Sequence, residues 1–169
     1  MIKKLYRAIL KLTNYLKVIF MEKMIFSSYE ITNSIKETIA DGGHFPLEVT
    51  GTSMQPFLIQ GRDVVWLCKC DVSEIKKGAI LLFERKDRSL VLHRVREVLP
   101  NGELLMNGDA QTWCEKISCD QVIAVVNEIE RNGKKIKCGT PADDFKILLW
   151  RGTKPVRYYI LRIWKMFRR

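Results

Sequence analysis

The chain has 169 residues, of which 47% are hydrophobic and 28% charged. This composition is sufficient to bury the core of one domain and excludes a disordered tract. Ten glycines and five prolines exclude a collagen-like or linker-like chain. The sequence contains no internal repeat, which argues against a solenoid. It also lacks a run of about 18 uncharged apolar residues, which argues against a conventional membrane-spanning helix.

Positive charge is concentrated at the two ends of the chain. Residues 1–26 carry six basic side chains and one acidic, and residues 145–169 carry eight basic and no acidic. The segment between them carries fifteen basic and eighteen acidic side chains, so the body is slightly acidic although the net charge is +10. A uniformly basic nucleic-acid-binding domain has a different pattern, and we expect no nucleic-acid partner.

Both ends show a helical period with one basic and one apolar face. The segment after Pro155 combines arginine and lysine with four aromatic side chains: Tyr158, Tyr159, Trp164 and Phe167. A helix of this length is too short to span a bilayer. Basic, apolar and aromatic side chains together are typical of a helix lying in a membrane interface. We therefore predict peripheral membrane association through both ends. The alternative is ordinary packing of the ends on the body or on a partner chain.

This charge pattern divides the chain into three parts. Residues 1–27 are predicted to form a basic amphipathic helix, residues 28–144 a β-domain with a short leading helix, and residues 145–169 a basic amphipathic segment. The first part is not a typical secretory signal, because Lys11 and Lys17 interrupt its apolar run.

Cysteine number and spacing indicate no metal site. The five cysteines are an odd number, which favours a reducing environment. Neither Cys68-x-Cys70 nor the pair Cys114 and Cys119 has the spacing of a typical structural zinc site. We expect no metal and no organic cofactor.

The body reads as a series of short strands. The isoleucines of residues 28–40 recur at four-residue spacing, which predicts a short amphipathic helix before the strands begin. Asn101-Gly102 and Asn132-Gly133 each separate two apolar runs, a pattern typical of tight hairpins. We predict a mainly β, antiparallel body with strands at Pro46–Thr50, Asp63–Lys69, Ala79–Glu84, Leu90–Val98, Glu103–Met106, Gln121–Ile129 and Lys134–Cys138.

Three clusters in the body carry residues suited to nucleophilic catalysis. The first, Gly51-Thr52-Ser53-Met54-Gln55-Pro56, places a serine in a turn. The second is a predicted strand that carries His93, and the third is a predicted loop that begins at Asn107-Gly108-Asp109 and contains Glu115. A serine, a histidine and an acid are the groups that form an activated nucleophile.

These clusters resemble the type I signal peptidases and, more broadly, the clan that includes the SOS-repressor autoproteases. The resemblance covers residues 46–130 and rests on five ordered boxes: TGTSMQP, GRDVVWL, KKGAILLF, LVLHRV and LLMNGDA. It implies a compact antiparallel β-body of the signal peptidase/repressor-autoprotease type, to which the periodicity described above adds short amphipathic helices at both ends. Ala79 departs from the pattern, because the family usually has aspartate at that position.

The resemblance implies that Ser53 is the nucleophile and His93 the general base. Most bacterial members have lysine at the position of His93, whereas the endoplasmic-reticulum and spore-former type has histidine, so this chain is similar to the Ser/His branch. A neutral imidazole is a competent base near pH 7. The acid stays open between two residues. Asp109 directly follows the glycine of the last box, and Glu115 stands seven residues after that glycine, where the Ser/His branch usually has its acid.

The expected substrate site surrounds the nucleophile. Gly51 stands where many members have a hydroxyl residue, and it allows a substrate backbone to approach closely, while the Ser53 N–H remains as an oxyanion donor. Thr52 and Met54 flank the nucleophile and complete the candidate substrate and oxyanion site. The resemblance implies a leader or signal peptide with small residues before the cut, bound as an extended strand along a sheet edge.

The expected function is a serine endopeptidase that cleaves a leader or signal peptide near a membrane surface. One alternative is a catalytically silent relative that binds peptides or membranes, to which the departures at Gly51, Ala79 and the acid position point. Another is a DNA-linked autoprotease, which would carry a lysine base and a helix-turn-helix that residues 1–45 do not suggest. Cysteine usage and basic ends favour the cytoplasmic face, whereas signal peptidases act on the opposite face, so the face of the membrane stays open.

Overall fold

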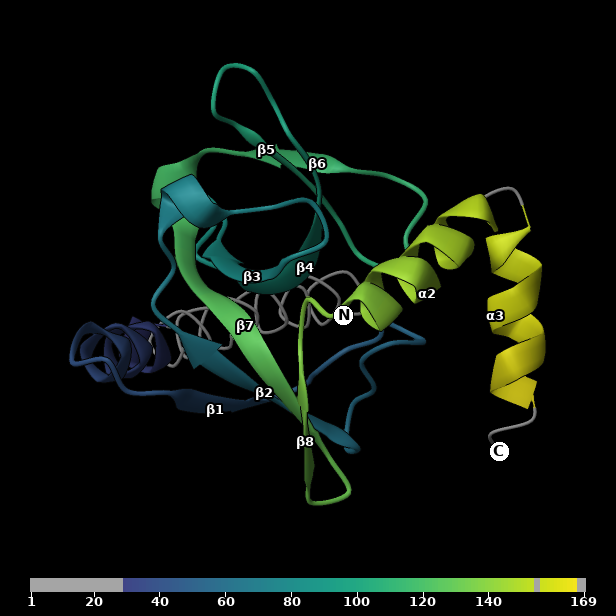
Figure 1. The fold of residues 1–169 in the computed structure, drawn as a ribbon, viewed down its shortest axis with the longest axis horizontal. Coiled ribbons are helices and arrows are strands. Elements are labelled where there is room, and N and C mark those ends of the chain that lie inside the picture. The colour runs from purple at the N-terminus through teal and green to yellow at the C-terminus, as the bar shows by residue number, and fades with distance from the viewer. Residues whose placement is uncertain (1–28, 154–155, 167–169) are drawn as a thin grey trace, which may run out of the picture.

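The structure is a computed structural model that describes residues 29–153 and 156–166. The helix expected over residues 1–27 and the last three residues of the basic C-terminal segment lie outside the described residues. The described chain is mainly antiparallel β-sheet with a few short helices, which confirms the predicted class (Figure 1).

Within residues 29–153 and 156–166, eight strands form one sheet in which every pairing is antiparallel. Their order is β1-β2-β7-β3-β4-β5-β6, and β8 pairs with β7. The strands are β1 Phe45–Glu48, β2 Asp63–Cys68, β3 Ile80–Glu84, β4 Leu90–Val98, β5 Leu104–Asn107, β6 Glu115–Ile117, β7 Val122–Arg131 and β8 Lys134–Lys137.

The predicted strands are all present, with ends that differ by one or two residues. The structure adds one strand, β6, in a stretch that the sequence suggested was a loop. Glu115 therefore opens a three-residue strand paired with β5 instead of lying in a loop. Three residues are too short for a period of two to be recognised in the sequence.

Strand β3 is buried on both faces because alternate side chains point to opposite sides of a sheet. Ile80 and Leu82 lie in one hydrophobic core, and Leu81 and Phe83 lie in a second. The neighbouring β4 has the same alternation, with Leu92 packed against the first core and Val91 and Val95 in the second. His93 lies between Leu92 and Arg94 near the middle of β4, where the sheet is buried from both sides.

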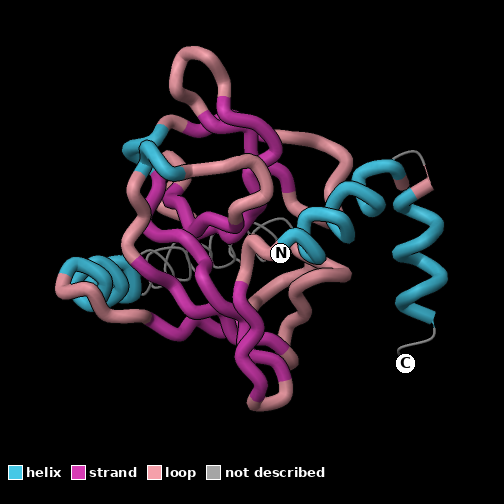
Figure 2. Tube along the Cα trace, viewed as in Figure 1, coloured by secondary structure: helices cyan, strands magenta, loops and turns pink. Residues whose placement is uncertain are grey.

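Helices flank the sheet at two places (Figure 2). Residues 29–40 form the predicted leading helix, and its Ile35 and Ile39 are buried in the first core. Two 3-10 turns, η1 Val72–Glu74 and η2 Cys119–Gln121, connect strands. The C-terminal segment forms α2 Pro141–Gly152 and α3 Arg157–Met166, which lie at the right of Figure 1, whereas residues 29–40 lie at its left. Within the described residues, no helix has the length and hydropathy needed to cross a membrane.

Candidate active site

Ser53 lies in the loop between β1 and β2 and is half-buried. Gly51 lies in this loop two residues before the serine, and its φ of +74° belongs to the left-handed region that glycine favours. Its N–H donates to Gln60 Oε1 at 3.0 Å, and Gln55 N donates to the carbonyl of Thr52 at 3.2 Å. These bonds hold the serine at a turn, as the sequence predicts.

The loop that follows β5 approaches Ser53 at the level of the main chain. Ala110 N donates to the Ser53 carbonyl oxygen at 2.8 Å. A Cβ at position 108 would lie 2.8 Å from the same oxygen and 2.7 Å from Gln111 Oε1, so only glycine fits there. Arg94 pairs with Asn107 across β4 and β5, and the chain therefore leaves β5 at Gly108 beside His93. Gly108 is the point at which the serine loop and the histidine strand come together.

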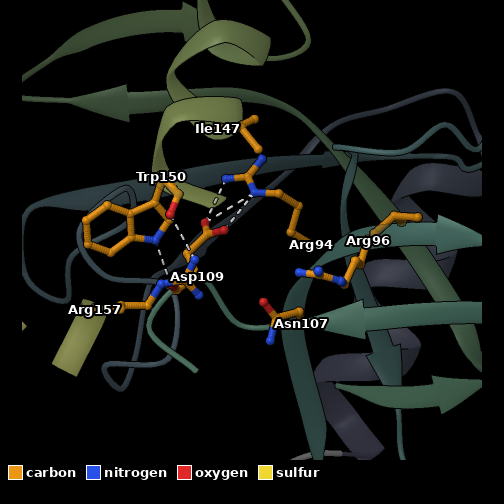
Figure 3. A pocket seen from close by; sticks show the side chains of 8 residues that line it. Arg94, Arg96, Asn107, Asp109, Ile147, Trp150 and Arg157 are labelled. Atoms are coloured by element: carbon orange, nitrogen blue, oxygen red, sulfur yellow. Dashed lines mark hydrogen bonds and ion pairs between the residues drawn. The ribbon is translucent and has the colours of Figure 1, made fainter. Parts of the chain in front are cut away.

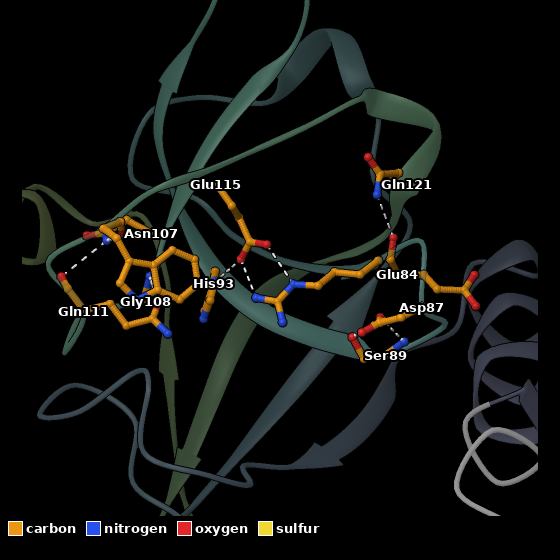
Figure 4. Close-up of polar contacts among 11 residues, drawn as sticks. Glu84, Asp87, Ser89, His93, Asn107, Gly108, Gln111, Glu115 and Gln121 are labelled. Carbon is orange, nitrogen blue, oxygen red and sulfur yellow. Dashed lines mark hydrogen bonds and ion pairs between the residues drawn. The ribbon is translucent and has the colours of Figure 1, made fainter. Parts of the chain in front are cut away.

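His93 is 1% exposed and its Nδ1 lies 3.0 Å from Glu115 Oε1 (Figure 4). The rings of Phe83 and Trp113 flank the imidazole, with centroids at 6.1 Å and 6.4 Å. Burial lowers the pKa of His93, and the charge of Arg85 acts in the same direction, although Glu115 partly opposes the shift. The imidazole is therefore held neutral at neutral pH.

Glu115 is fixed by a second partner that the sequence analysis did not identify. Arg85 Nε donates to Glu115 Oε2 at 2.7 Å and its Nη2 donates to Oε1 at 2.6 Å. Burial alone would raise the pKa of Glu115, but the hydrogen bonds and charge of Arg85 outweigh it and lower the pKa. The carboxylate is thus anionic and acts only as an acceptor. No local pattern indicates Arg85, because its partner lies thirty positions further along the chain.

Asp109 does not contact His93 in the structure. Its carboxylate is buried and accepts three hydrogen bonds from Arg94, at 2.8–3.2 Å (Figure 3). The indole N–H of Trp150 donates to the Asp109 carbonyl oxygen at 2.7 Å. Of the two candidate acids, the structure brings Glu115 to the histidine, whereas Asp109 joins the loop after β5 to Arg94 on β4 and to α2.

The C-terminal helices are attached to the same loop. Arg157, at the start of α3, is 2% exposed and donates to the carbonyl oxygens of Gln111 and Trp150 at 2.9 Å and 3.0 Å. The rings of Phe57 and Trp150 meet edge to face, with centroids 6.0 Å apart. Arg157 and Trp150 thus attach the start of α3 and the end of α2 to the body.

A cavity of about 600 Å³ opens beside the serine. It is lined by residues of the serine loop, of the loop after β5 and of α3, among them Ser53, Gln55, Trp113, Tyr158, Leu161 and Arg162. Trp113 both lines this cavity and stacks its edge against His93. Gln55 is buried, and its Oε1 has no hydrogen-bond partner. Neither Gln55 nor α3 was assigned to the site from the sequence.

The structure does not join the serine directly to the histidine. Among the described residues no hydrogen bond links Ser53 and His93. The two residues share neighbours instead: Gly108 lies beside the Ser53 carbonyl oxygen, and Trp113 packs on His93 and lines the same cavity as Ser53. Of the flanking residues, Gly51 and Thr52 are exposed. Met54 is 3% exposed and its side chain lies in the first hydrophobic core, so only its backbone is near a substrate site.

The described residues contain no group of three or more histidine, cysteine or carboxylate side chains placed to hold a metal ion. All five cysteines are free thiols in the structure. Burial raises the pKa of Cys70 to about 11, with a smaller contribution from the neighbouring Cys68, so this thiol is a weak nucleophile at neutral pH.

Comparison with protein-family models, with curated proteins and with solved structures found no match for this chain. The similarity to the signal peptidases therefore rests on the sequence boxes, and the site geometry is the independent information about chemistry.

Proposed function

We propose that the protein is a serine endopeptidase of the signal peptidase type, in which Ser53 is the nucleophile, His93 the general base and Glu115 the residue that orients the base. The observation that carries this proposal is the 3.0 Å contact between Glu115 Oε1 and Nδ1 of a buried histidine. His93 lies where the pairing of β4 with β5 ends, and the serine loop meets the sheet at the same place.

The protonation state of His93 supports its role as a base. Because the Glu115 carboxylate can only accept, the neutral imidazole carries its proton on Nδ1 and donates it to Glu115. The lone pair is then on Nε2, the nitrogen available to a hydroxyl group. Burial lowers the pKa of His93, so this neutral tautomer is the resting state near pH 7.

The proposed reaction is acyl transfer in two steps. Ser53 Oγ forms a bond to the carbonyl carbon of the scissile peptide while its proton passes to His93 Nε2. The imidazolium then donates that proton to the leaving amine as the C–N bond breaks, which leaves an acyl-enzyme. Water, activated by His93, hydrolyses the ester and regenerates Ser53. Such serine–histidine bonds are often long before a substrate binds.

The pairing of β4 offers a place for an extended substrate. Residues Arg94–Val98 pair with β5, whereas Leu90–His93 pair only with β3 among the described strands. The β5 side of Leu90–His93 is thus an open edge that ends at the proposed base. A peptide added along this edge would be held in register by main-chain hydrogen bonds, with its side chains alternating between two faces. A leader or signal peptide with small residues before the cut is the substrate class that we propose.

A second function, peptide binding without catalysis on the same scaffold, is favoured by one observation. His93 is 1% exposed and Trp113 lies against it, while no hydrogen bond joins it to Ser53 in the described residues. A protein that binds a peptide at the open edge of β4 but does not move Ser53 to His93 would have this geometry.

Proteolysis of a complex peptide mixture separates the two functions. The full chain is incubated with a proteome-derived peptide library, and new N-termini are quantified by mass spectrometry. We expect cleavage after small residues, reduced at least about a thousandfold in Ser53→Ala and in His93→Ala. Ser89→Ala and His44→Ala are matched controls, because Ser89 bonds Asp87 in an exposed turn and His44 is exposed.

The outcomes are distinct. Cleavage that persists in Ser53→Ala, with circular dichroism equal to that of the wild type, would contradict the proposed nucleophile. Retention of library peptides without any new N-termini, in the wild type and both variants alike, would instead support the non-catalytic function.

A further inference from the structure

The two C-terminal helices expose an unusual amount of apolar surface. Seven large apolar side chains on them are 55–72% exposed: Phe145, Leu148, Leu149, Tyr158, Tyr159, Ile163 and Met166, which we call the α2–α3 face. Among the other described residues, only Tyr29 and Trp113 expose a large apolar side chain by more than half. Apolar side chains gathered in this way on a soluble surface mark a binding site, whereas scattered ones do not.

Both helices are nevertheless firmly attached to the body. Ile147 on α2 and Arg157 on α3 are buried against the body, and the hydrogen bonds of Arg157 and Trp150 connect both helices to the loop after β5. The side chains that face the body thus include an arginine as well as Ile147 and Trp150, while the seven apolar side chains of the α2–α3 face point outward. This is the reverse of the pattern of a helix whose apolar stripe covers its own core.

Charge indicates the chemistry of the partner. Residues 141–169, which span both helices, carry eight basic and two acidic side chains (Asp143 and Asp144), whereas residues 27–140 carry fifteen basic and sixteen acidic. Exposed leucine, isoleucine and tyrosine beside a predominantly basic set of charges match an anionic lipid surface, in which the apolar side chains enter the acyl boundary and the basic groups meet the headgroups.

We propose that the α2–α3 face docks on an anionic lipid bilayer and thereby places the cavity of Ser53 at the membrane surface. The second part follows from continuity, since Tyr158 belongs to the α2–α3 face and, with Leu161 and Arg162 of the same helix, lines that cavity. Docking depends on surface chemistry alone and does not require Ser53 to be catalytic, so it can be tested separately from the proposed peptidase activity.

The test uses the full chain carrying Ser53→Ala and vesicles of phosphatidylcholine with or without phosphatidylglycerol. Partition is measured by flotation. We expect binding to the phosphatidylglycerol vesicles that weakens about tenfold in Leu148→Gln and again in Ile163→Gln, since each removes one inserted apolar side chain. Val98→Gln is the matched control, because Val98 is an exposed apolar residue at the far end of β4.

Each other result overturns the proposal. Partition that is equal in Leu148→Gln, Ile163→Gln and wild type would show that the chain binds lipid elsewhere, for example through residues 1–28, or does not bind. Variants that dissociate an oligomer in light scattering but keep wild-type partition would identify the α2–α3 face as a protein interface. Unchanged thermal unfolding of the variants ensures that a loss of partition does not reflect misfolding.

Discussion

The guanidinium of Arg85 forms a two-point ion pair with the carboxylate of Glu115, and the same carboxylate contacts His93. The pair joins the turn after β3 to the first residue of β6 and fixes the carboxylate in one orientation. It also has opposite electrostatic effects at the histidine. Glu115 raises the pKa of His93, whereas burial, which is the larger influence, and the charge of Arg85 lower it.

The two candidate acids are expected to respond differently to neutralisation. Glu115→Gln should reduce kcat/KM by at least about a hundredfold, because an amide can donate a hydrogen bond and then favours the wrong tautomer of His93. Asp109→Asn should instead lower the free energy of unfolding by about 3 kcal/mol, because it leaves the buried Arg94 without its counter-charge. Peptide hydrolysis and urea unfolding of both variants measure the two effects.

Either effect in the other variant would reverse this assignment. If Asp109→Asn abolishes hydrolysis at wild-type stability while Glu115→Gln is active, then Asp109 is the acid that matters to catalysis. Glu97→Gln serves as the control, because Glu97 is exposed on the same strand as His93.

Removal of Arg85 should shift the pH dependence of the reaction. In the wild type, the acid limb of kcat/KM should have its midpoint below the ordinary imidazole value of about 6.5, because the pKa of His93 is lowered. Arg85→Gln removes a cation that contributes to that lowering while Glu115 stays anionic, so the midpoint should move to higher pH. The other charged groups near His93 are Glu115 and Asp109, both retained in this variant.

Arg88→Gln is the matched control for this shift. Arg88 pairs with Glu84 in the same turn, but its side chain is 63% exposed and it does not contact Glu115. An acid limb that moves equally in both variants would assign the effect to net charge. A limb that stays in place in Arg85→Gln would mean that Arg85 acts on the fold alone.

Much of the sheet could be predicted because its signals are local. The Asn-Gly turns at 101–102 and 132–133 and the alternating burial of strands such as β2 depend on neighbouring residues only. The separate helix α2 was not predicted, because the expected boundary after residue 144 falls inside it and its apolar Phe145, Leu148 and Leu149 face outward. Exposure of apolar residues is a tertiary property that the sequence period does not encode.

The candidate site, like the fold, could be predicted only where its signals are local. Ser53 and His93 were identified because they lie in recognisable boxes, and Glu115 because of its spacing from Gly108. The contacts that distinguish Glu115 from Asp109 are made by Arg85 and Arg94, which lie in other elements and follow no local pattern. Choosing between two nearby carboxylates thus requires knowledge of which arginine each one meets.

Attachment of the C-terminal helices should depend on Arg157. Arg157→Leu removes the donors to the carbonyl oxygens of Gln111 and Trp150, and we expect the free energy of unfolding to fall by about 3 kcal/mol. Hydrogen exchange should become faster across residues 157–166 and in the loop after β5. Arg162→Leu, an exposed position on the same helix, should change neither quantity. Equal exchange in the two variants would mean that Arg157 does not anchor α3.

Stability at low pH should depend on Asp63, whose side chain is fully buried and bonded to Arg62 and Arg131. Burial alone would raise the pKa of Asp63, but these hydrogen bonds and that of Ile59 N outweigh it and lower the pKa. A carboxyl group with a lowered pKa in the folded state stabilises the fold above its unfolded pKa of about 3.9. That contribution is lost as pH falls through the lower, folded value.

Asp63→Asn should therefore remove stability at neutral pH and flatten the acid limb of the unfolding curve. We expect a loss of about 3 kcal/mol near pH 7, because two arginines lose their shared counter-charge, and a much smaller difference from wild type once the pH is below the lowered pKa of folded Asp63. Urea unfolding across this pH range measures both. Asp120→Asn, at an exposed position, controls for the change in net charge. If the difference in free energy of unfolding between Asp63→Asn and wild type is independent of pH, the asparagine destabilises the fold for steric or hydrogen-bonding reasons. The charge of Asp63 would then not stabilise the junction of β1, β2 and β7.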